Sequence, residues 1–296
     1  MEPIVKAENL FFRYSSTKSI KINSGEKNRK WILENINFTI NKGDFVVIAG
    51  KNGSGKSTLL KLIDLLLLPT KGKIYIFDKD ISEIADPYEV RSKIGFVFQN
   101  PKHQIITNTV LDEVAFGPEN LGLPREIIKR RIERAVKLTG IDDFLNRRTD
   151  ELSGGQKQLV AIASVLTIDP EILLFDEPTS MLHPEYHNRI IKIIEQLNAQ
   201  GKTVILVTHN SKDFLIGTEN VKTRNRLFII SDGNLIYDAD PKNLFENYKN
   251  IIDKNDLELP AAVRISKQIK DRLGDFPVCI SIQELSEKIS NYIGLK

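Results

Sequence analysis

The residues with the clearest chemical meaning form one glycine-rich run at positions 50–58. They are Gly50, Lys51, Asn52, Gly53, Ser54, Gly55, Lys56, Ser57 and Thr58. Glycines at this spacing let the backbone wrap around a phosphate with its N–H groups pointing inward. Lys56 would then reach the β and γ phosphates, and the Ser57 hydroxyl would ligate Mg²⁺. Because the run lies between an expected strand and an expected helix, it predicts a nucleoside triphosphate site rather than a merely flexible loop.

Two adjacent carboxylates form the second candidate group. The apolar run 172–175 is followed by Asp176 and Glu177, and ligands of open α/β sheets bind at the carboxyl ends of strands. If the chain turns there, Asp176 can hold Mg²⁺ while Glu177 polarises an attacking water. Paired carboxylates after a strand are also common as helix caps, but beside a phosphate-binding run they favour a role in hydrolysis.

A second glycine turn comprises Ser153, Gly154, Gly155 and Gln156, preceded by Leu152. It opens an expected helix, so its backbone N–H groups can bind a second anion. Taken alone, the turn is more often a helix N-cap with a glycine bend. In a chain that already holds a phosphate loop, two copies paired head to tail could each offer Ser153 and Gly155 to the other's γ-phosphate.

The elements that position these residues follow from short apolar runs. Residues 44–49 form such a run before the glycine turn, and helix-forming residues 56–67 follow it, as expected of a buried strand feeding a helix. Similar strand-like runs occupy 94–98, 172–175, 203–208 and 227–230. Strands alternating with helices predict a wound α/β fold. Two more strand-like runs, 5–14 and 31–40, come first, separated by the polar segment 15–30, which we expect to be a long exposed loop.

Two regions depart from the strand–helix alternation. Residues 109–166, including Arg125–Thr139, are helical in pattern without a convincing strand, which predicts an inserted helical subdomain. After Pro241 the sequence is charged and helical in character, with breaks at Pro260 and Pro277. A small C-terminal extension is therefore expected.

Composition narrows the class of protein further. The 42 basic and 39 acidic residues leave a net charge of +3, too balanced to indicate a nucleic-acid partner. The single cysteine, Cys279, cannot form an internal disulfide, and its apolar surroundings predict an unreactive thiol in a reducing compartment. We expect no signal peptide at the N-terminus, and the apolar stretch 59–68 is well short of the ~20 residues that a membrane helix needs.

In this order the glycine-rich run, the Asp-Glu pair and the Leu-Ser-Gly-Gly-Gln sequence resemble the Walker A, Walker B and signature motifs of ABC transporter nucleotide-binding subunits. The resemblance covers about residues 4–240. It implies a P-loop NTPase (RecA-like) α/β core with an antiparallel β subdomain, ATP and Mg²⁺ as ligands, and ATP hydrolysis. The expected nucleotide-binding domain, 1–240, includes a helical subdomain at about 102–168, and the extension 241–296 is expected to help dimerisation.

The resemblance also assigns roles to single residues. Gln99 matches the Q-loop glutamine that contacts Mg²⁺ and water and senses the membrane partner. His209 matches the switch histidine that contacts the γ-phosphate, and Tyr14 matches the aromatic residue that stacks on adenine. With Lys56 and Glu177 these complete the expected site. Outside the family they would be an ordinary surface glutamine, a structural histidine and a core aromatic residue.

Within ABC ATPases, two segments are similar to those of energy-coupling factor importers, which take up vitamins and transition-metal ions. These are 98–101, Phe-Gln-Asn-Pro, and 112–120; residues 179–182 look more like the first of the two ATPase subunits in such importers. The similarity implies a peripheral protein on the cytoplasmic face of the cell membrane. Its expected partners are a second ATPase subunit, equal or different, a transmembrane coupling protein and a substrate-binding membrane protein.

One residue departs from the family pattern. The D-loop normally ends in aspartate, but this chain has His183 before Pro184. Since the aspartate helps couple the two sites of a dimer, hydrolysis is expected to be slowed or asymmetric unless a partner subunit compensates. Two alternatives stay open: a nucleotide-sensing subunit with impaired hydrolysis, and a soluble ABC ATPase that is not tied to transport. The sequence does not identify the transported solute.

Overall fold

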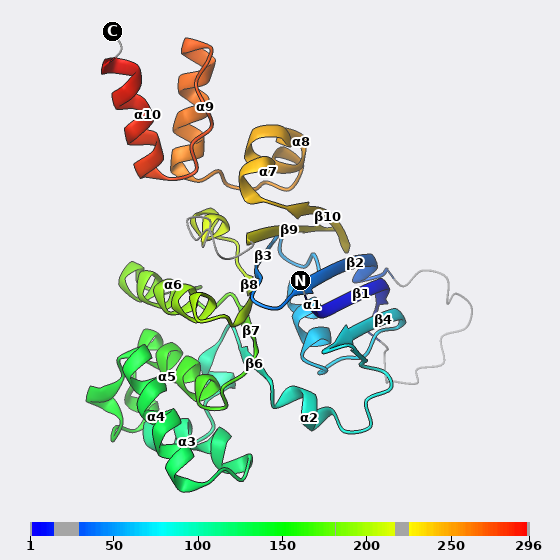
Figure 1. The fold of residues 1–296 in the computed structure, drawn as a ribbon, viewed down its shortest axis with the longest axis vertical. Coiled ribbons are helices and arrows are strands. Elements are labelled where there is room, and N and C mark those ends of the chain that lie inside the picture. The colour runs from blue at the N-terminus through cyan, green and yellow to red at the C-terminus, as the bar shows by residue number, and fades with distance from the viewer. Residues whose placement is uncertain (1, 15–29, 181, 217–224, 295–296) are drawn as a thin grey trace.

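The computed structural model describes residues 2–14, 30–180, 182–216 and 225–294. Nearly all of the expected loop 15–30 lies outside the described residues, as does Met181. A six-stranded and a four-stranded sheet form the centre of the fold. In Figure 1, one group of helices lies below the sheets, and the C-terminal helices project from the opposite end.

The larger sheet has the strand order β10-β9-β3-β8-β7-β6. The strands are β3 (Phe45–Ala49), β6 (Ile94–Val97), β7 (Ile172–Asp176), β8 (Thr203–Val207), β9 (Asn225–Ser231) and β10 (Asn234–Ala239). All are parallel except β10, which pairs with β9 in the antiparallel sense. Because only β8 separates β3 from β7, the carboxyl ends of the two motif-bearing strands meet at one edge of the sheet.

Alternate residues of the central strands enter two different hydrophobic cores. In β3, Phe45 and Val47 belong to one core, while Val46 and Ile48 belong to the other. Both faces of the sheet are therefore covered, and every residue of β3, β7 and β8 is buried. This two-sided burial explains why the sequence shows continuous apolar runs there rather than alternation.

The smaller sheet, in the order β2-β1-β4-β5, shares one of these cores with the first helix. Its antiparallel strands are β1 (Pro3–Phe12), β2 (Leu33–Asn41), β4 (Lys71–Ile76) and β5 (Lys79–Asp80). The sequence indicated β1 and β2 but missed β4. The first three residues of β4 are exposed, so no apolar run marks that strand.

Helix α1, Lys56–Ile63, is shorter than the predicted 56–67. Asp64 is its C-cap, and the next residue, Leu65, has a φ of 56°. A right-handed helix cannot continue through that conformation. The leucines after Asp64 favour a helix in the sequence pattern, so the predicted helix extended past the residue at which the backbone turns.

A second set of helices covers the other core. They are α3 (Val110–Asn120), α4 (Arg125–Thr139), α5 (Gly154–Thr167) and α6 (Pro184–Ala199). The short helix α2 (Pro87–Arg91) instead places Val90 in the core that the smaller sheet shares with α1. Helix α4 has the bounds that the sequence predicted and ends where Gly140 adopts a φ of 62°. Helices α3, α4 and α5 pack on one another and form the lower group in Figure 1.

The C-terminal residues form four further helices. They are α7 (Pro241–Asn247), α8 (Lys249–Lys254), α9 (Ala261–Leu273) and α10 (Ile282–Gly294). Helices α9 and α10 share a small core that includes Phe276 and Cys279, while Val263 and Val278 join the main core. Burial raises the pKa of the Cys279 thiol, in keeping with the expected unreactive cysteine.

Candidate functional site

The glycine-rich run forms the turn between β3 and α1. Gly50 and Gly55 have φ values of 141° and 109°, which residues with a side chain rarely adopt. A Cβ at Gly50 would lie 2.1 Å from the carbonyl oxygen of Ile230 in the neighbouring strand β9. Gly50 is therefore required both by its backbone conformation and by the close approach of β9.

Lys56, the first residue of α1, folds back over this turn. Its Nζ donates hydrogen bonds to the carbonyl oxygens of Gly50 (2.9 Å) and Lys51 (3.0 Å). Burial lowers the pKa of the ammonium group, and the nearby carboxylates of Glu177 and Asp176 act in the opposite direction. The loop thus holds a largely desolvated cation where a bound phosphate would need one.

Ser57 and Asp176 meet across the carboxyl edge of the sheet. Ser57 Oγ donates to Asp176 Oδ1 at 2.9 Å. Burial raises the pKa of the Asp176 carboxyl, and the Ser57 hydrogen bond partly offsets this rise. Nearby, the buried Ser54 Oγ has no hydrogen-bond partner among the described residues. A hydroxyl, a carboxylate and an unsatisfied hydroxyl are oxygen donors of the kind that Mg²⁺ and phosphate require.

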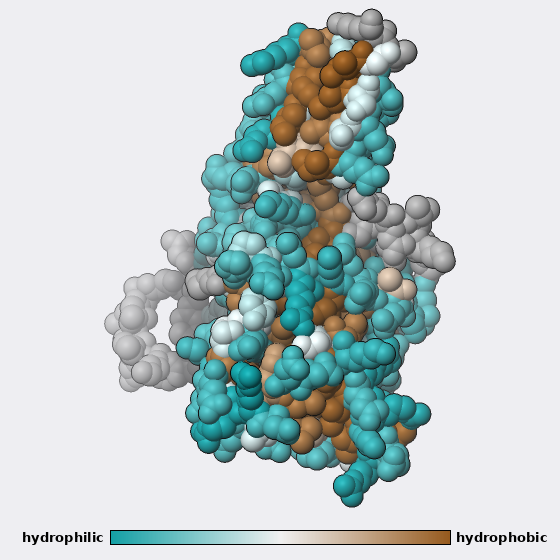
Figure 2. Space-filling model, turned by 90° about the vertical axis from the view of Figure 1, so that its left-hand side faces the viewer, coloured by the Kyte–Doolittle hydropathy of each residue, from teal (hydrophilic) through white to brown (hydrophobic). Residues whose placement is uncertain are grey.

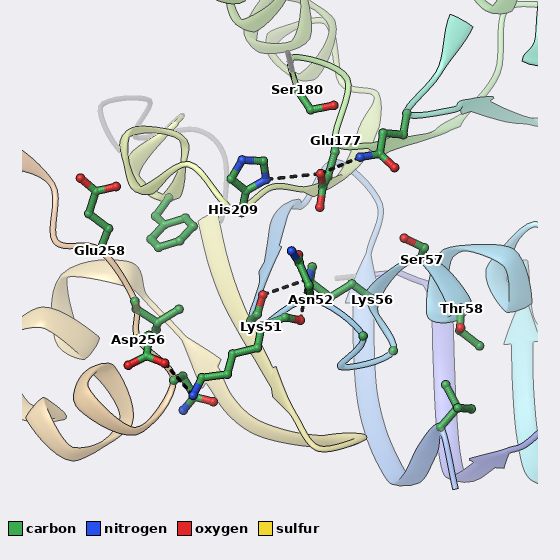
Figure 3. Close-up of a pocket in the computed structure, with 18 of the residues that line it drawn as sticks. Lys51, Asn52, Lys56, Ser57, Thr58, Glu177, Ser180, His209, Asp256 and Glu258 are labelled. Atoms are coloured by element: carbon green, nitrogen blue, oxygen red, sulfur yellow. Dashed lines mark hydrogen bonds and ion pairs between the residues drawn. The ribbon is translucent and has the colours of Figure 1, made fainter. Parts of the chain in front are cut away.

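Glu177 is at the centre of the second motif. Gln99 Nε2 donates to Glu177 Oε2 at 3.0 Å, and His209 Nδ1 lies 3.3 Å from the same oxygen. Glu177 has a φ of 48°, so the chain does turn directly after β7. Figure 3 shows Glu177 and His209 side by side above the glycine-rich turn. The expected base, glutamine and histidine therefore form one group of polar side chains in contact, which faces Lys56.

The turn that presents His209 is itself held by a buried acid. Thr208 Oγ1 donates to Asp213 Oδ2 at 2.8 Å and accepts from the Asn210 N–H at 3.1 Å. His187 Nε2 lies 3.1 Å from the other carboxylate oxygen. Burial raises the pKa of Asp213, and its contacts with Thr208 and His187 oppose that rise. No local sequence pattern predicts this support, because the side chains of His187, Thr208 and Asp213 come from three separate segments.

Lys56, Ser57, Gln99, Glu177 and His209 line one pocket of about 870 Å³. The lining residues expected from the sequence are Tyr14, Gly50, Lys51, Asn52, Gly53, Gly55, Lys56, Ser57, Thr58, Gln99, Glu177 and His209. Ser54 and Asp176 do not line it, although Asp176 reaches it through Ser57. Ile32, Ser180, Phe214 and residues 255–258 also line the pocket, and the sequence analysis assigned none of them to the site.

Tyr14 marks one end of this pocket. Its ring packs edge to face on Phe12 with 4.9 Å between ring centroids, and its Oη lies 3.4 Å from Thr58 Oγ1. About half of the side chain is exposed. An exposed aromatic face beside the phosphate loop offers a stacking surface for a planar base.

The signature residues do not line this pocket. Ser153 caps α5: its Oγ accepts from the Gln156 N–H, and Gln156 Oε1 accepts from the Ser153 N–H. Gly155 packs so tightly that a Cβ there would lie 2.4 Å from the Tyr186 ring, whereas Gly154 has open space around it. Ser153 and Gly154 are exposed, so this helix start is accessible to a second subunit.

His183 is also away from the pocket. It is exposed and is the N-cap residue of α6, where its side chain makes no capping hydrogen bond. Ser180, in the same turn, does line the pocket. The D-loop departure therefore lies outside the group formed by Gln99, Glu177 and His209.

The donors present fit ATP with Mg²⁺. The loop supplies positive-φ glycines, a desolvated lysine and the orphaned Ser54 hydroxyl, while Ser57 and Asp176 provide oxygen ligands. In the part of the chain that the structure describes, no three His, Cys, Asp or Glu side chains cluster as a metal site. In phosphoryl-transfer sites Mg²⁺ takes some of its oxygen ligands from the nucleotide and others from side chains such as Ser57 and Asp176.

Comparison with known proteins agrees with this fold and site. A family model described as "ABC transporter" matches residues 33–180. An ATP-binding cassette solved as a dimer in a post-hydrolysis state with ADP and phosphate superposes with a TM-score of 0.69 at 32% identity, covering 80% of this chain and 99% of that one. The chain belongs to the ABC transporter family and is an ATP-binding ATPase subunit.

More similar relatives narrow the family. The energy-coupling factor transporter ATP-binding protein EcfA1 of Caldanaerobacter subterraneus is 40% identical over 97% of this chain and 98% of that protein. The EcfA protein of Methanocaldococcus jannaschii is 36% identical over 98% of both. Within ABC ATPases the chain belongs to the energy-coupling factor type.

Among solved structures, cbiO1 of Clostridium perfringens has a TM-score of 0.71 and 33% identity, covering 91% of this chain and all of that one. That protein is described as part of the ABC transporter complex cbiONQ. In the described ranges of our chain, no helix combines the length and hydrophobicity needed to cross a bilayer.

Proposed function

We propose that this chain powers an energy-coupling factor importer by hydrolysing ATP between two paired ATPase subunits. The observation that carries the proposal is the position of Glu177. Its carboxylate is held by Gln99 and His209 and faces the buried Lys56 of the phosphate loop. A carboxylate so placed can act as a general base toward a water that attacks a bound γ-phosphate.

The proposed mechanism gives each side chain of the site a defined role. Lys56 stabilises the charge that develops on the transferred phosphoryl group, and Tyr14 stacks on the adenine. Ser57, Asp176 and the Gln99 amide oxygen would hold Mg²⁺, which neutralises phosphate charge. Glu177 accepts a proton from the attacking water, while His209 keeps the carboxylate in place and contacts the γ-phosphate.

A second subunit completes the site. Because Ser153 and its glycines lie outside the pocket of their own chain, we infer that they cap the γ-phosphate held by a partner. A helix start with free N–H groups is suited to that anion. ATP would then join the two subunits, and hydrolysis would let the pair reopen, so that motion of the pair is the output.

The membrane assignment rests on the relatives. Their names tie them to energy-coupling factor transporters and, in one case, to the ABC transporter complex cbiONQ. We propose the same setting here: a peripheral protein at the cytoplasmic face of the cell membrane, below a transmembrane coupling protein and a substrate-binding membrane protein. The transported solutes would be vitamins or transition-metal ions.

Replacing Glu177 with glutamine tests the mechanism. Loss of the general base should lower phosphate release by 100-fold or more while ATP binding is retained. Glu185→Gln, at an exposed position of α6, is the matched control and should keep wild-type turnover. Phosphate release is measured on the purified assembly extracted from membranes in detergent.

Three results would contradict the proposal. Wild-type turnover in Glu177→Gln would remove Glu177 as the base. Tight ATP binding without phosphate release by the wild-type assembly would instead favour a nucleotide-sensing subunit. Purification without any membrane protein would favour a soluble ABC ATPase.

A further inference from the structure

The C-terminal extension forms part of the nucleotide pocket. Residues 255–258, between α8 and α9, line the same pocket as the phosphate loop. Lys51 Nζ, from that loop, lies 2.7 Å from Asp256 Oδ2. Figure 3 shows Lys51 reaching out of the loop toward Asp256, with Glu258 beyond it. An ion pair therefore joins the phosphate loop to the extension.

A second observation points to the same segment. Asn255 lines the pocket and is only 3% exposed. Its Nδ2 donates to the Ile251 carbonyl at 2.8 Å, which anchors the segment to α8. Its Oδ1 is buried without a hydrogen-bond partner among the described residues. A buried, unsatisfied acceptor beside a ligand pocket is unusual and calls for a physical reason.

From these contacts we propose that segment 255–258 sets the affinity of the pocket for ATP by opposing its phosphates. The inference rests on the proposed function. Asp256 neutralises a lysine of the phosphate loop, and Glu258 adds a second carboxylate to the same rim. Both charges disfavour a polyanion, and the penalty grows with the number of phosphates on the nucleotide.

The solvent exposure of the Lys51 and Asp256 side chains limits how much their contact changes the affinity for ATP. The Lys51 and Asp256 side chains are 50% and 80% exposed, so solvent and salt screen their charges strongly. An exposed pair of this kind changes affinity by about two- to fivefold rather than by orders of magnitude. By linkage, ATP binding loosens the contact between loop and extension to the same degree. The extension can thereby respond to the nucleotide state of the pocket.

Equilibrium binding of fluorescent ATP to the purified chain tests the inference without hydrolysis or transport. Asp256→Asn should lower the Kd for ATP about two- to fivefold, with a smaller change for ADP and none for adenosine. The difference should shrink at high salt. Asp275→Asn, at an exposed position between α9 and α10, makes the same chemical change away from the pocket and should leave Kd unaltered.

The outcomes separate the two proposals. If the wild-type chain does not bind ATP, the proposed function itself fails. If it binds ATP but Asp256→Asn has an equal or higher Kd, only the role of the extension is overturned. Equal changes for ATP and adenosine would also overturn it, because a charge effect must follow the phosphates. Thermal unfolding of each variant checks that the fold is intact.

Discussion

At the scale of single residues, a buried carboxyl group outside the pocket affects the stability of the fold. Asp64, the C-cap of α1, is 5% exposed, and Arg91 Nη2 lies 3.9 Å from its Oδ2. Burial raises its pKa from 3.8 to about 7, and Arg91 only partly counteracts this. Near neutral pH the fold therefore carries a carboxyl group that binds a proton much more tightly than the unfolded chain does.

The Asp64 pKa predicts how stability depends on pH. Since the folded-state pKa is raised, the unfolded chain loses this proton first, and the free energy of unfolding falls as pH rises from about 4 to 7. Asp64→Asn removes that loss. Between pH 5 and pH 8, the free energy of unfolding of the wild type should therefore fall by about 3 kcal/mol more than that of the variant. Urea unfolding at the two pH values measures this difference. Parallel wild-type and variant profiles would contradict the prediction.

How much of the site the sequence could predict also depends on single residues. Lys56, Ser57, Asp176 and Glu177 lie in contiguous patterns whose chemistry can be read locally. Asp256 has no such pattern, and only the folded chain brings it to Lys51. A contact between distant segments, made by common residue types, produces no recognisable pattern in the sequence.

At the scale of elements, the strands with two buried faces were predictable, as were β1 and β2, whereas β4, β5 and β10, which have few buried residues, were not. Strand β10 alternates between exposed and partly buried residues and has one fully buried position, so it lacks the apolar run that marked β7. Helix ends were also less predictable than helix centres, because a single backbone turn at Leu65 ended α1. The local periodicity of apolar residues reveals neither a strand with few buried residues nor the residue at which a helix ends.

The start of α6 supplies the prediction at this scale. His183 occupies the N-cap with a φ of −60° and a ψ of 145°, but its side chain makes no capping bond. His183→Asp should add one and should also interact favourably with the helix dipole, raising stability by about 0.5–2 kcal/mol. Thermal unfolding at pH 7 measures the gain. His183→Ala, which cannot cap, is the control; a gain in both variants would show that loss of histidine, not capping, is responsible.

At the scale of the whole molecule, the extension is tied to the cassette at one end and presents apolar side chains at the other. Val263 and Val278 join the main core, and Asp256 meets the phosphate loop. Figure 2 shows apolar side chains gathered along the C-terminal helices at the top of the molecule. The exposed ones on α9 and α10 are Ile265, Leu273, Ile282 and Ile293. Such a surface is suited to contact with a second ATPase subunit.

Two residues of α10 test whether this surface helps to hold the pair together. Ile282 and Ile293 are 61% and 67% exposed, so the double substitution to glutamine should leave the fold intact. If both side chains are buried between subunits, their loss should weaken pairing by about tenfold or more, because each contributes roughly 1 kcal/mol of apolar burial. Lys288→Gln with Asn291→Gln, at exposed polar positions on the opposite side of the same helix, is the matched control. Sedimentation of the ATP-bound Glu177→Gln background measures pairing, and an unchanged dissociation constant would mean that the cassettes alone hold the dimer.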